Sequence, residues 1–424
     1  MNSVALGWIA LLVFILTIVI GVKRKLNLGI LAFAVAFVFG LFVKVDGGAM
    51  SSVGLKGVPV TSLFPFNIFW LTLSVSLMLN VGSSNGTFDV IISKLVGMAH
   101  GRRAIIPIIV FAVMFIACSA GAGSTGVVVL LCTIAATISK DQDIDPVFML
   151  LAVLSGSTVA IGSPVAVIGI ICNTFSEDLW GERIAPSYMY PRAAAMAILT
   201  FAVIYIIYGG WKLKKRPVDA DIKALKLNRQ QIITLIGFAA FILLTIVIGF
   251  EMGLAAFMVT AILLFLKCAD EKKIIAEVPW ASILLICGMC VLIGVVTAAG
   301  GIDIITNFLK KLMNQYTVKP IYSILGSLLA MVSSVTGVVL PSLIPTIPDI
   351  AVSTGTNPYA LVTALAYGAN ITCASPLSSM GAIALGIMGA NLEYDISKLF
   401  KLMLIMSFIL MAVSAVWAAI GIAG

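Results

Sequence analysis

Two Ser-Pro dipeptides stand inside long apolar segments: Ser163-Pro164 within 147–172 and Ser375-Pro376 within 359–386. Proline lacks a backbone donor and disfavours helix in the residue before it, so each dipeptide is expected to break a helix in its middle. Carbonyls freed at a break can coordinate a cation, and the N-terminus of the following half-helix can hold an anion. The structural alternative is a proline kink used only for packing, but two kinks at matching positions favour a binding function.

Two other apolar stretches, 104–139 and 320–351, are interrupted by small and hydroxyl residues, SAGAGSTG at 119–126 and SSVTGVVLP at 333–341. Each arm has only about 15 residues, whereas a membrane-spanning helix needs about 20. We therefore predict two re-entrant hairpins, each entering and leaving the membrane on the same side.

No Asp, Glu, Lys or Arg lies in 104–139, 147–176, 320–348 or 359–392, which include both breaks and both hairpin tips. A proton antiporter usually needs a carboxylate within the membrane, so this absence argues against one. A site of amides and hydroxyls suits an anion whose charge is offset by a co-bound cation. The available polar groups are Ser119, Ser124, Thr125, Thr158 and Ser163 in the first half, and Ser333, Ser334, Thr336, Asn370, Thr372, Ser375, Ser378 and Ser379 in the second.

The composition places these segments in a lipid bilayer. Of 424 residues, 61% are hydrophobic and 10% are charged, whereas soluble domains carry about 25% charged residues. The net charge of +8 arises from basic residues in short loops, which indicates membrane topology and not nucleic-acid binding. The CxxC pair Cys287 and Cys290 lacks a second pair or a nearby histidine, so no metal or redox site is expected.

Ten stretches are long and apolar enough to span a bilayer. The first lacks a basic leader, so we read it as a retained helix and not as a signal peptide. The distribution of Lys and Arg predicts that both termini lie outside the inner membrane and that the basic linker 212–230 is cytoplasmic. The ten stretches are 4–22, 27–45, 66–82, 147–172, 191–211, 231–249, 252–268, 279–299, 359–386 and 400–422.

A series of proline, serine and aspartate residues occurs in the same order in both halves of the chain. Pro146 matches Pro358 and Ser163-Pro164 matches Ser375-Pro376 at an offset of 212 positions, while Ser119 aligns with Ser333 and Asp89 with Asp303 at 214. Shared Leu, Ile and Val could arise by chance, but this ordered punctuation indicates a duplication. Because five spans are an odd number, the second copy is inverted in the membrane, as in secondary transporters.

The predicted fold is therefore an all-α polytopic membrane protein with two inverted repeats. Each repeat has five transmembrane helices and one re-entrant hairpin, with broken helices at the membrane midplane. The first repeat covers 1–211 and includes scaffold helices within 1–82, and the second covers 231–424.

The IGSP at 161–164 and the CASP at 373–376 resemble the Gly-Ser/Thr-Pro breaks of the ion transporter superfamily, which includes divalent anion:sodium symporters. NLGILAFAVAFVFG (27–40), SSNGTFDVIISKLV (83–96) and the first hairpin are similar to the malonate/dicarboxylate carrier (MatC-type) family. The resemblance implies a homodimer with a scaffold, a moving transport domain and an elevator motion. One departure is that neither tip contains the asparagine of sodium-coupled dicarboxylate members.

The resemblance also implies which residues bind. Two sodium sites would form where each hairpin tip meets the neighbouring break, and substrate would lie between the tips; no other cofactor is expected. The sodium set is Ser119, Gly162, Ser163, Ser333, Thr336, Ala374 and Ser375. The substrate set is Ser119, Gly123, Ser124, Thr125, Ser333, Ser334, Thr336, Asn370 and Ser378.

Three functions remain open from the sequence. The first is a secondary symporter for a small di- or tricarboxylate such as malonate or succinate. The second is a carrier of the same fold for another solute: an inorganic oxyanion, a sugar acid, or a cation exchanged against protons. The third is a membrane enzyme or a passive channel. An enzyme is disfavoured because no span holds a histidine, an acid pair or an activated nucleophile.

Overall fold

A computed structural model describes residues 3–24, 26–41, 63–88, 90, 102–121, 125–214, 227–392 and 396–424. These residues form helices and connecting loops, without a strand. Six of the described helical segments are long and apolar enough to cross a membrane: Phe66–Ser84, Pro146–Trp180, Pro186–Ile207, Trp280–Ala298, Val335–Thr354 and Ser397–Ala419. Shorter apolar helices accompany them, so the described chain is that of a polytopic membrane protein.

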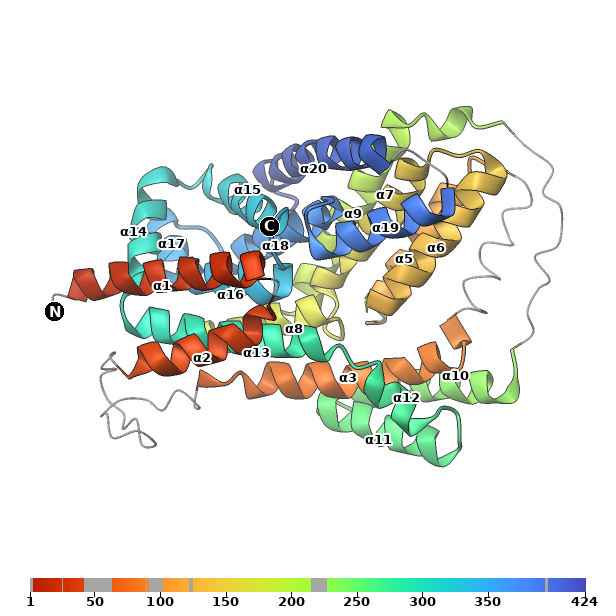
Figure 1. The fold of residues 1–424 in the computed structure, drawn as a ribbon, viewed down its shortest axis with the longest axis horizontal. Helices are drawn as coiled ribbons and strands as arrows, with labels where there is room; N and C mark the ends of the chain where they lie inside the picture. The colour runs from red at the N-terminus through yellow and green to blue at the C-terminus, as the bar shows by residue number, and fades with distance from the viewer. Residues whose placement is uncertain are drawn as a thin grey trace.

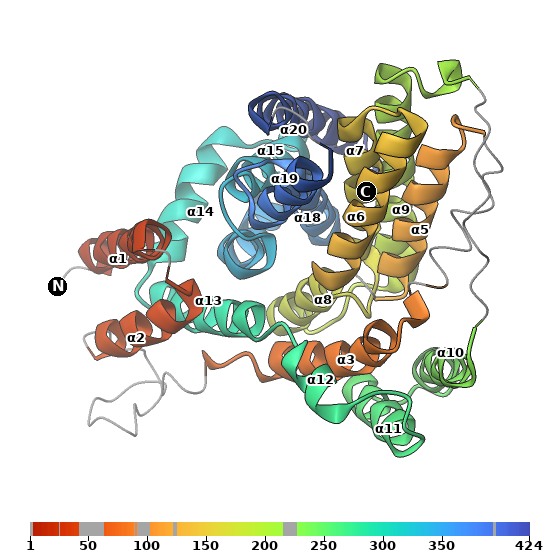
Figure 2. The ribbon, with the colours of Figure 1, turned by 45° about the vertical axis from the view of Figure 1, so that its right-hand side comes forward.

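One group of helices forms a layer along one side of the molecule (Figures 1 and 2). We call this group the α3/α13 layer. It comprises α1 (Ser3–Arg24), α2 (Leu28–Gly40), α3 (Phe66–Ser84), α10 (Arg229–Ile242) with the π-helical η4 (Leu243–Val247), α11 (Met252–Phe265), α12 (Glu271–Ala276) and α13 (Trp280–Ala298).

The other helices form what we call the α7/α18 bundle, which lies against the layer (Figure 2). From the first half it takes α5 (Ile106–Ser119), α6 (Thr125–Gln142), α7 (Pro146–Ser157), η2 (Thr158–Gly162), α8 (Val167–Trp180), α9 (Pro186–Ile207) and η3 (Gly210–Lys212). From the second it takes α15 (Val318–Ala330), η5 (Val335–Val339), α16 (Leu340–Leu343), η6 (Ile344–Thr346), α17 (Ile347–Thr354), α18 (Pro358–Ile371), η7 (Thr372–Ala374), α19 (Ser379–Leu392) and α20 (Ile396–Ala419).

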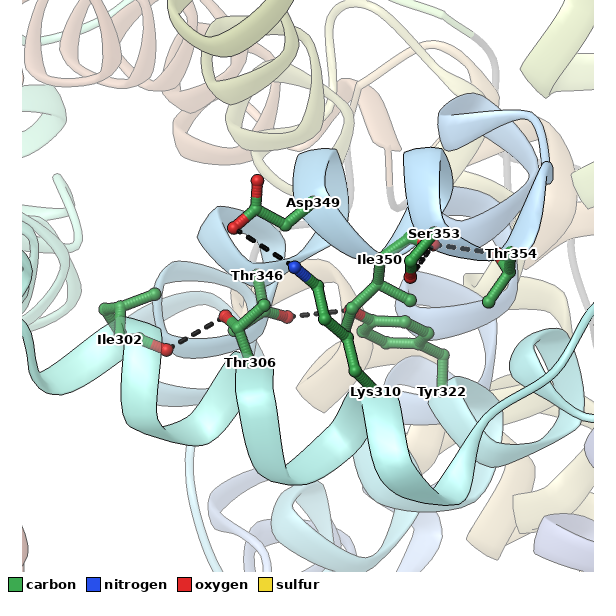
Figure 3. A network of polar contacts seen from close by, with 9 residues as sticks. All are labelled: Ile302, Thr306, Lys310, Tyr322, Thr346, Asp349, Ile350, Ser353 and Thr354. Atoms are coloured by element: carbon green, nitrogen blue, oxygen red, sulfur yellow. Dashed lines mark hydrogen bonds and ion pairs between the residues drawn. The ribbon is translucent and has the colours of Figure 1, made fainter.

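The amphipathic helix α14 (Gly301–Leu312) connects the layer to the bundle. On its bundle side, Lys310 Nζ lies 3.7 Å from Asp349 Oδ2 of α17. The buried Tyr322 hydroxyl of α15 lies 2.7 Å from Thr346 Oγ1, which ties the two arms of the second hairpin together (Figure 3).

Crossed contacts between the two halves of the chain hold the layer together. Helix α2 packs on α13, where Gly29 leaves no room for a Cβ beside the backbone of Leu284. Helix α11 packs on α3, where Gly253 is equally close to the indole of Trp70. Small residues let membrane helices approach closely, and here each half supplies one glycine and one partner helix.

Both Ser-Pro dipeptides interrupt their helices. After α7, the chain narrows into the 3₁₀ segment η2, and Ser163 is extended with a ψ of 122° before α8 begins. After α18, the 3₁₀ segment η7 leads to Ser375, extended with a ψ of 129°. These conformations are the ones expected of a residue before proline, so the breaks lie where the sequence predicts them.

The two hairpins differ in their returning arms. In the first hairpin the return is a single helix, α6. The second is divided into η5, α16, η6 and α17, where Pro341, Pro345 and Pro348 follow one another closely. Because each proline removes a backbone donor, three of them prevent one regular helix from forming.

Candidate functional site

A cavity of about 240 Å³ lies between the α3/α13 layer and the α7/α18 bundle. A cavity of this size has room for several water molecules, and therefore for a small organic acid. Helices α3 and α13 supply one wall, and the segments around both breaks and both hairpins supply the other. The lining residues are Thr72, Val75, Ser76, Leu79, Asn80, Cys118, Gly121, Val128, Ser157, Ala160, Val165, Val167, Ile168, Ile170, Pro279, Ser282, Ile286, Ala330, Ser333, Ser334, Val335, Thr336, Asn370, Ser378 and Met380.

The described lining contains hydroxyl, amide and apolar side chains and no charged one. The described residues also contain no group of three or more His, Cys, Asp or Glu side chains able to hold a metal ion. A cation at this site would therefore be held by carbonyl and hydroxyl oxygens, which are the ligands that hard cations accept.

Five of the predicted substrate residues line the cavity: Ser333, Ser334, Thr336, Asn370 and Ser378. Ser334 caps η5, where its Oγ accepts a hydrogen bond from Gly337 N at 3.2 Å. The Asn370 amide donates to Ser157 O at 3.3 Å, which joins α18 to the end of α7. The second hairpin tip and the second break thus meet at the cavity.

The predicted residues of the first tip are placed differently. Ser119 is not part of the lining; its Oγ donates to Phe115 O at 2.7 Å and accepts from the Tyr190 hydroxyl at 2.8 Å. Gly123 and Ser124 lie outside the described residues, and only the backbone of Thr125, the first residue of α6, is described. Gly121, next to this tip, does line the cavity.

The serines of the two breaks fasten each break to its hairpin. Ser163 Oγ donates to Ser119 O at 2.8 Å, and Ser375 Oγ donates to Met331 O at 3.0 Å. Both serines are fully buried. Each hydroxyl has its proton engaged. Ser375 Oγ also accepts a hydrogen bond from Leu377 N at 3.3 Å, which leaves it one lone pair for a cation.

The small residues before the two serines lie in packed surroundings. A Cβ on Gly162 would collide with the backbone of Tyr190 in α9, so only glycine fits there. Ala374 is 1% exposed. Neither Gly162 nor Ala374 lines the cavity.

Two half-helices begin at the cavity. Val167 and Ile168 at the start of α8 line it, as do Ser378 and Met380 at the start of α19. The positive end of a helix dipole and its free N–H groups favour an anion at such a position. The arrangement can therefore hold an anion without a charged side chain.

Sequence reasoning missed the wall supplied by the layer. Thr72, Ser76 and Asn80 of α3 line the cavity, together with Ser282 of α13. Sequence reasoning also missed Ser157 of α7, which lines the cavity from the bundle. The residues of α3 could have been identified from their spacing of four, which puts the polar side chains of Thr72, Ser76 and Asn80 on one face of an otherwise apolar helix.

Matching positions of the two halves meet in the lining. Cys118 and Ala330, Gly121 and Ser333, and Ile168 and Met380 are three pairs of lining residues, each 212 positions apart. Thr72 and Ile286 form a fourth pair, 214 positions apart on α3 and α13. The cavity therefore draws on corresponding parts of both halves.

Comparisons with known proteins agree with this architecture. Residues 4–167 match the family model described as the dicarboxylate carrier protein MatC N-terminus. These residues are MatC-like in sequence. The match confirms the resemblance expected from the motifs of this region. No curated protein matches the chain.

The chain also matches solved structures, including the crystal structure of the Alcanivorax borkumensis YdaH transporter, reported to have an unusual topology. The TM-score is 0.63 at 14% sequence identity, and the match covers 99% of this chain and 97% of that chain. At this identity the likeness shows a shared fold. Together with the MatC match, it supports a membrane transporter and not an enzyme.

Proposed function

We propose that this protein is a secondary transporter that carries a small di- or tricarboxylate, such as malonate or succinate, together with a cation. The observation that carries the proposal is the uncharged, hydroxyl-lined cavity between the second hairpin tip, the helix breaks and the layer. The MatC-like sequence of residues 4–167 supports the choice of a carboxylate.

The chemistry of the cavity favours an anion that binds together with a cation. The starts of α8 and α19, with the hydroxyls of Ser334 and Thr336, offer partial positive charge and donors to a carboxylate. A dianion would nevertheless carry uncompensated charge into a low-dielectric site, which is costly. A sodium ion moving with the substrate would offset that charge, with oxygen ligands at the two Ser-Pro breaks.

The proposal includes two inverted repeats, 1–211 and 231–424, joined by the linker 212–230. The crossed glycine contacts of α2 and α11, the matching hydrogen bonds of Ser163 and Ser375, and the paired lining residues support this duplication. In an elevator motion the α7/α18 bundle would carry substrate past the α3/α13 layer. The position of the cavity between the two groups supports that division.

We also propose a homodimer in the inner membrane with both termini outside. Mass measurement of the purified protein in detergent tests the dimer. Labelling of single cysteines introduced at each terminus with a membrane-impermeant reagent tests the orientation, since the opposite topology would protect both termini in intact cells.

The decisive experiment is uptake of labelled malonate and succinate into liposomes containing the purified protein, with and without an inward sodium gradient. Sodium-dependent accumulation is expected. Uptake driven only by a proton gradient would reassign the coupling ion, and uptake of sulfate or gluconate alone would reassign the substrate. Uptake that never saturates would indicate a channel.

A charge variant links that activity to the cavity. Asn370→Asp places a negative charge of nearly the same shape in the lining, so it should abolish uptake of a dianion through repulsion. Asn314→Asp makes the same change at an exposed turn after α14 and should transport normally. Equal transport by both variants would place the substrate elsewhere.

A further inference from the structure

Helix α3 presents polar side chains to the cavity from the layer, on the side opposite the bundle. Thr72, Ser76 and Asn80 recur every four residues and all three line the cavity. The amide of Asn80 donates to Ile274 O at 3.0 Å, which fixes the C-terminal part of this face against α12. Of the three, Thr72 is the one whose hydroxyl is both buried and without a hydrogen-bond partner among the described residues.

The hydroxyl of Thr72 is buried and has no hydrogen-bond partner among the described residues. The residue is 2% exposed. A buried hydroxyl without a partner costs stability, and such a group calls for an explanation. Because Thr72 lines the cavity, a ligand bound in the cavity could accept this hydrogen bond.

Other buried threonine hydroxyls donate a hydrogen bond to a backbone carbonyl of their own helix. Thr260 Oγ1 donates to Ala256 O at 2.7 Å, and Thr306 Oγ1 donates to Ile302 O at 2.9 Å. Each uses the carbonyl four residues earlier, the usual local partner of a helical threonine. Thr72 does not use that carbonyl, so its hydroxyl proton has no acceptor among the described residues.

The corresponding position of the other half gives a contrast. Ile286 stands on α13, 214 positions after Thr72, and it also lines the cavity. Two equivalent places in the layer therefore offer one hydroxyl and one apolar surface. At this pair of positions the donor lies on α3, and the hydroxyl that α13 supplies stands one turn earlier, at Ser282.

We propose that Thr72 is a substrate-binding residue supplied by the layer, donating its hydroxyl proton to a carboxylate of the transported anion. This inference rests on the proposed function and extends it. The bundle would hold the anion through the second hairpin tip and the helix starts, while Thr72 fixes its orientation against the layer. The contact breaks when bundle and layer move past each other, so it contributes in the conformation described here.

The test compares three variants in liposomes with labelled malonate and succinate. Thr72→Val has nearly the same shape but no donor, and we expect its apparent KM to rise about 10-fold, the effect of losing one hydrogen bond to a charged group. Thr72→Ser keeps the donor and should stay within about twofold of wild type. Thr260→Val removes a hydroxyl from a layer helix away from the cavity and should leave KM unchanged.

A second readout separates binding from packing. Without ligand, Thr72→Val should be at least as stable to heat as wild type, because it removes an unsatisfied buried hydroxyl. With malonate, its gain in stability should be smaller than that of wild type. Higher stability with unchanged KM and unchanged malonate response would overturn the inference and leave the proposed function intact. A wild type that neither transports nor responds to either acid would overturn both.

Discussion

The first and second Ser-Pro breaks can be compared group by group. In both, the serine hydroxyl donates to a carbonyl at the end of the first hairpin arm, Ser119 O at 2.8 Å and Met331 O at 3.0 Å. Their surfaces toward the cavity differ, because the first half supplies mainly apolar residues and the second supplies most of the hydroxyls. The serine hydrogen bonds that both halves share stabilise the fold. The hydroxyls in which the halves differ would determine which ligand binds.

The largest expected effect concerns the close packing that both halves use. Gly156 of α7 faces Phe111 O of α5, and Gly368 of α18 faces Ser323 O of α15; in each case a Cβ would collide with that carbonyl. Gly368→Leu should cost about 3 kcal/mol of stability, since a backbone group cannot move aside for the side chain. Thermal unfolding in detergent measures the loss.

A matched control lies in the same half of the chain. Gly386 of α19 has no atom near the position of a Cβ, so Gly386→Leu should leave the unfolding temperature almost unchanged. Gly156→Leu should behave like Gly368→Leu. Tolerance of leucine at only one of these two sites would mean that the two helix pairs do not pack alike.

The next effect concerns the serines of the breaks. Ser163→Ala and Ser375→Ala each remove a buried donor to a hairpin carbonyl, and each should cost about 1–2 kcal/mol of stability. The two losses should add in the double variant, because the sites share no partner. Ser407→Ala is the control, since that buried hydroxyl only bonds Met403 O within α20. A loss at one serine alone would break the comparison.

A smaller effect should fall on binding alone, at the tip of the second hairpin. Thr336→Val removes a lining hydroxyl without changing side-chain shape, and we expect malonate affinity to fall about 10-fold with little change in stability. Thr354→Val, where the hydroxyl bonds Ile350 O away from the cavity, is the control. Titration of thermal stability with malonate distinguishes them, and equal responses would remove Thr336 from the site.

The sequence predicts the two helix breaks well, because the residues that cause each break are adjacent in the chain. A Ser-Pro dipeptide determines the backbone before the proline by sterics alone, so both helix interruptions could be placed from the sequence. The hairpin tips are harder to align from the sequence. Their serines pair Ser119 with Ser333 at an offset of 214, but the hydrogen bonds of the two breaks make Met331 the counterpart of Ser119, at the offset of 212 that the breaks follow.

The rest of the site depends on tertiary packing. The polar face of α3 could have been read from its four-residue spacing, but only the folded chain shows that it borders the second hairpin tip and the helix breaks. Likewise, the sequence gives no hydrogen-bond partner for the hydroxyls of Ser163 and Ser375. In the structure both hydroxyls donate to hairpin carbonyls. Local patterns predict where helices break, and long-range contacts decide what the breaks face.

The smallest expected effect concerns an ion pair of the second half whose acidic residue has no acidic counterpart in the first-half sequence. Lys310 and Asp349 join α14 to α17 at 3.7 Å (Figure 3), whereas Thr137 stands at the first-half position matching Asp349. Their side chains are 33% and 65% exposed, so water and salt screen the pair, and Lys310→Gln should cost less than about 0.5 kcal/mol. Thermal unfolding at low and high salt measures this loss, which should vanish at high salt. A loss well above that value, insensitive to salt, would mean that this ion pair holds the second hairpin to α14 in a way the first hairpin does not need.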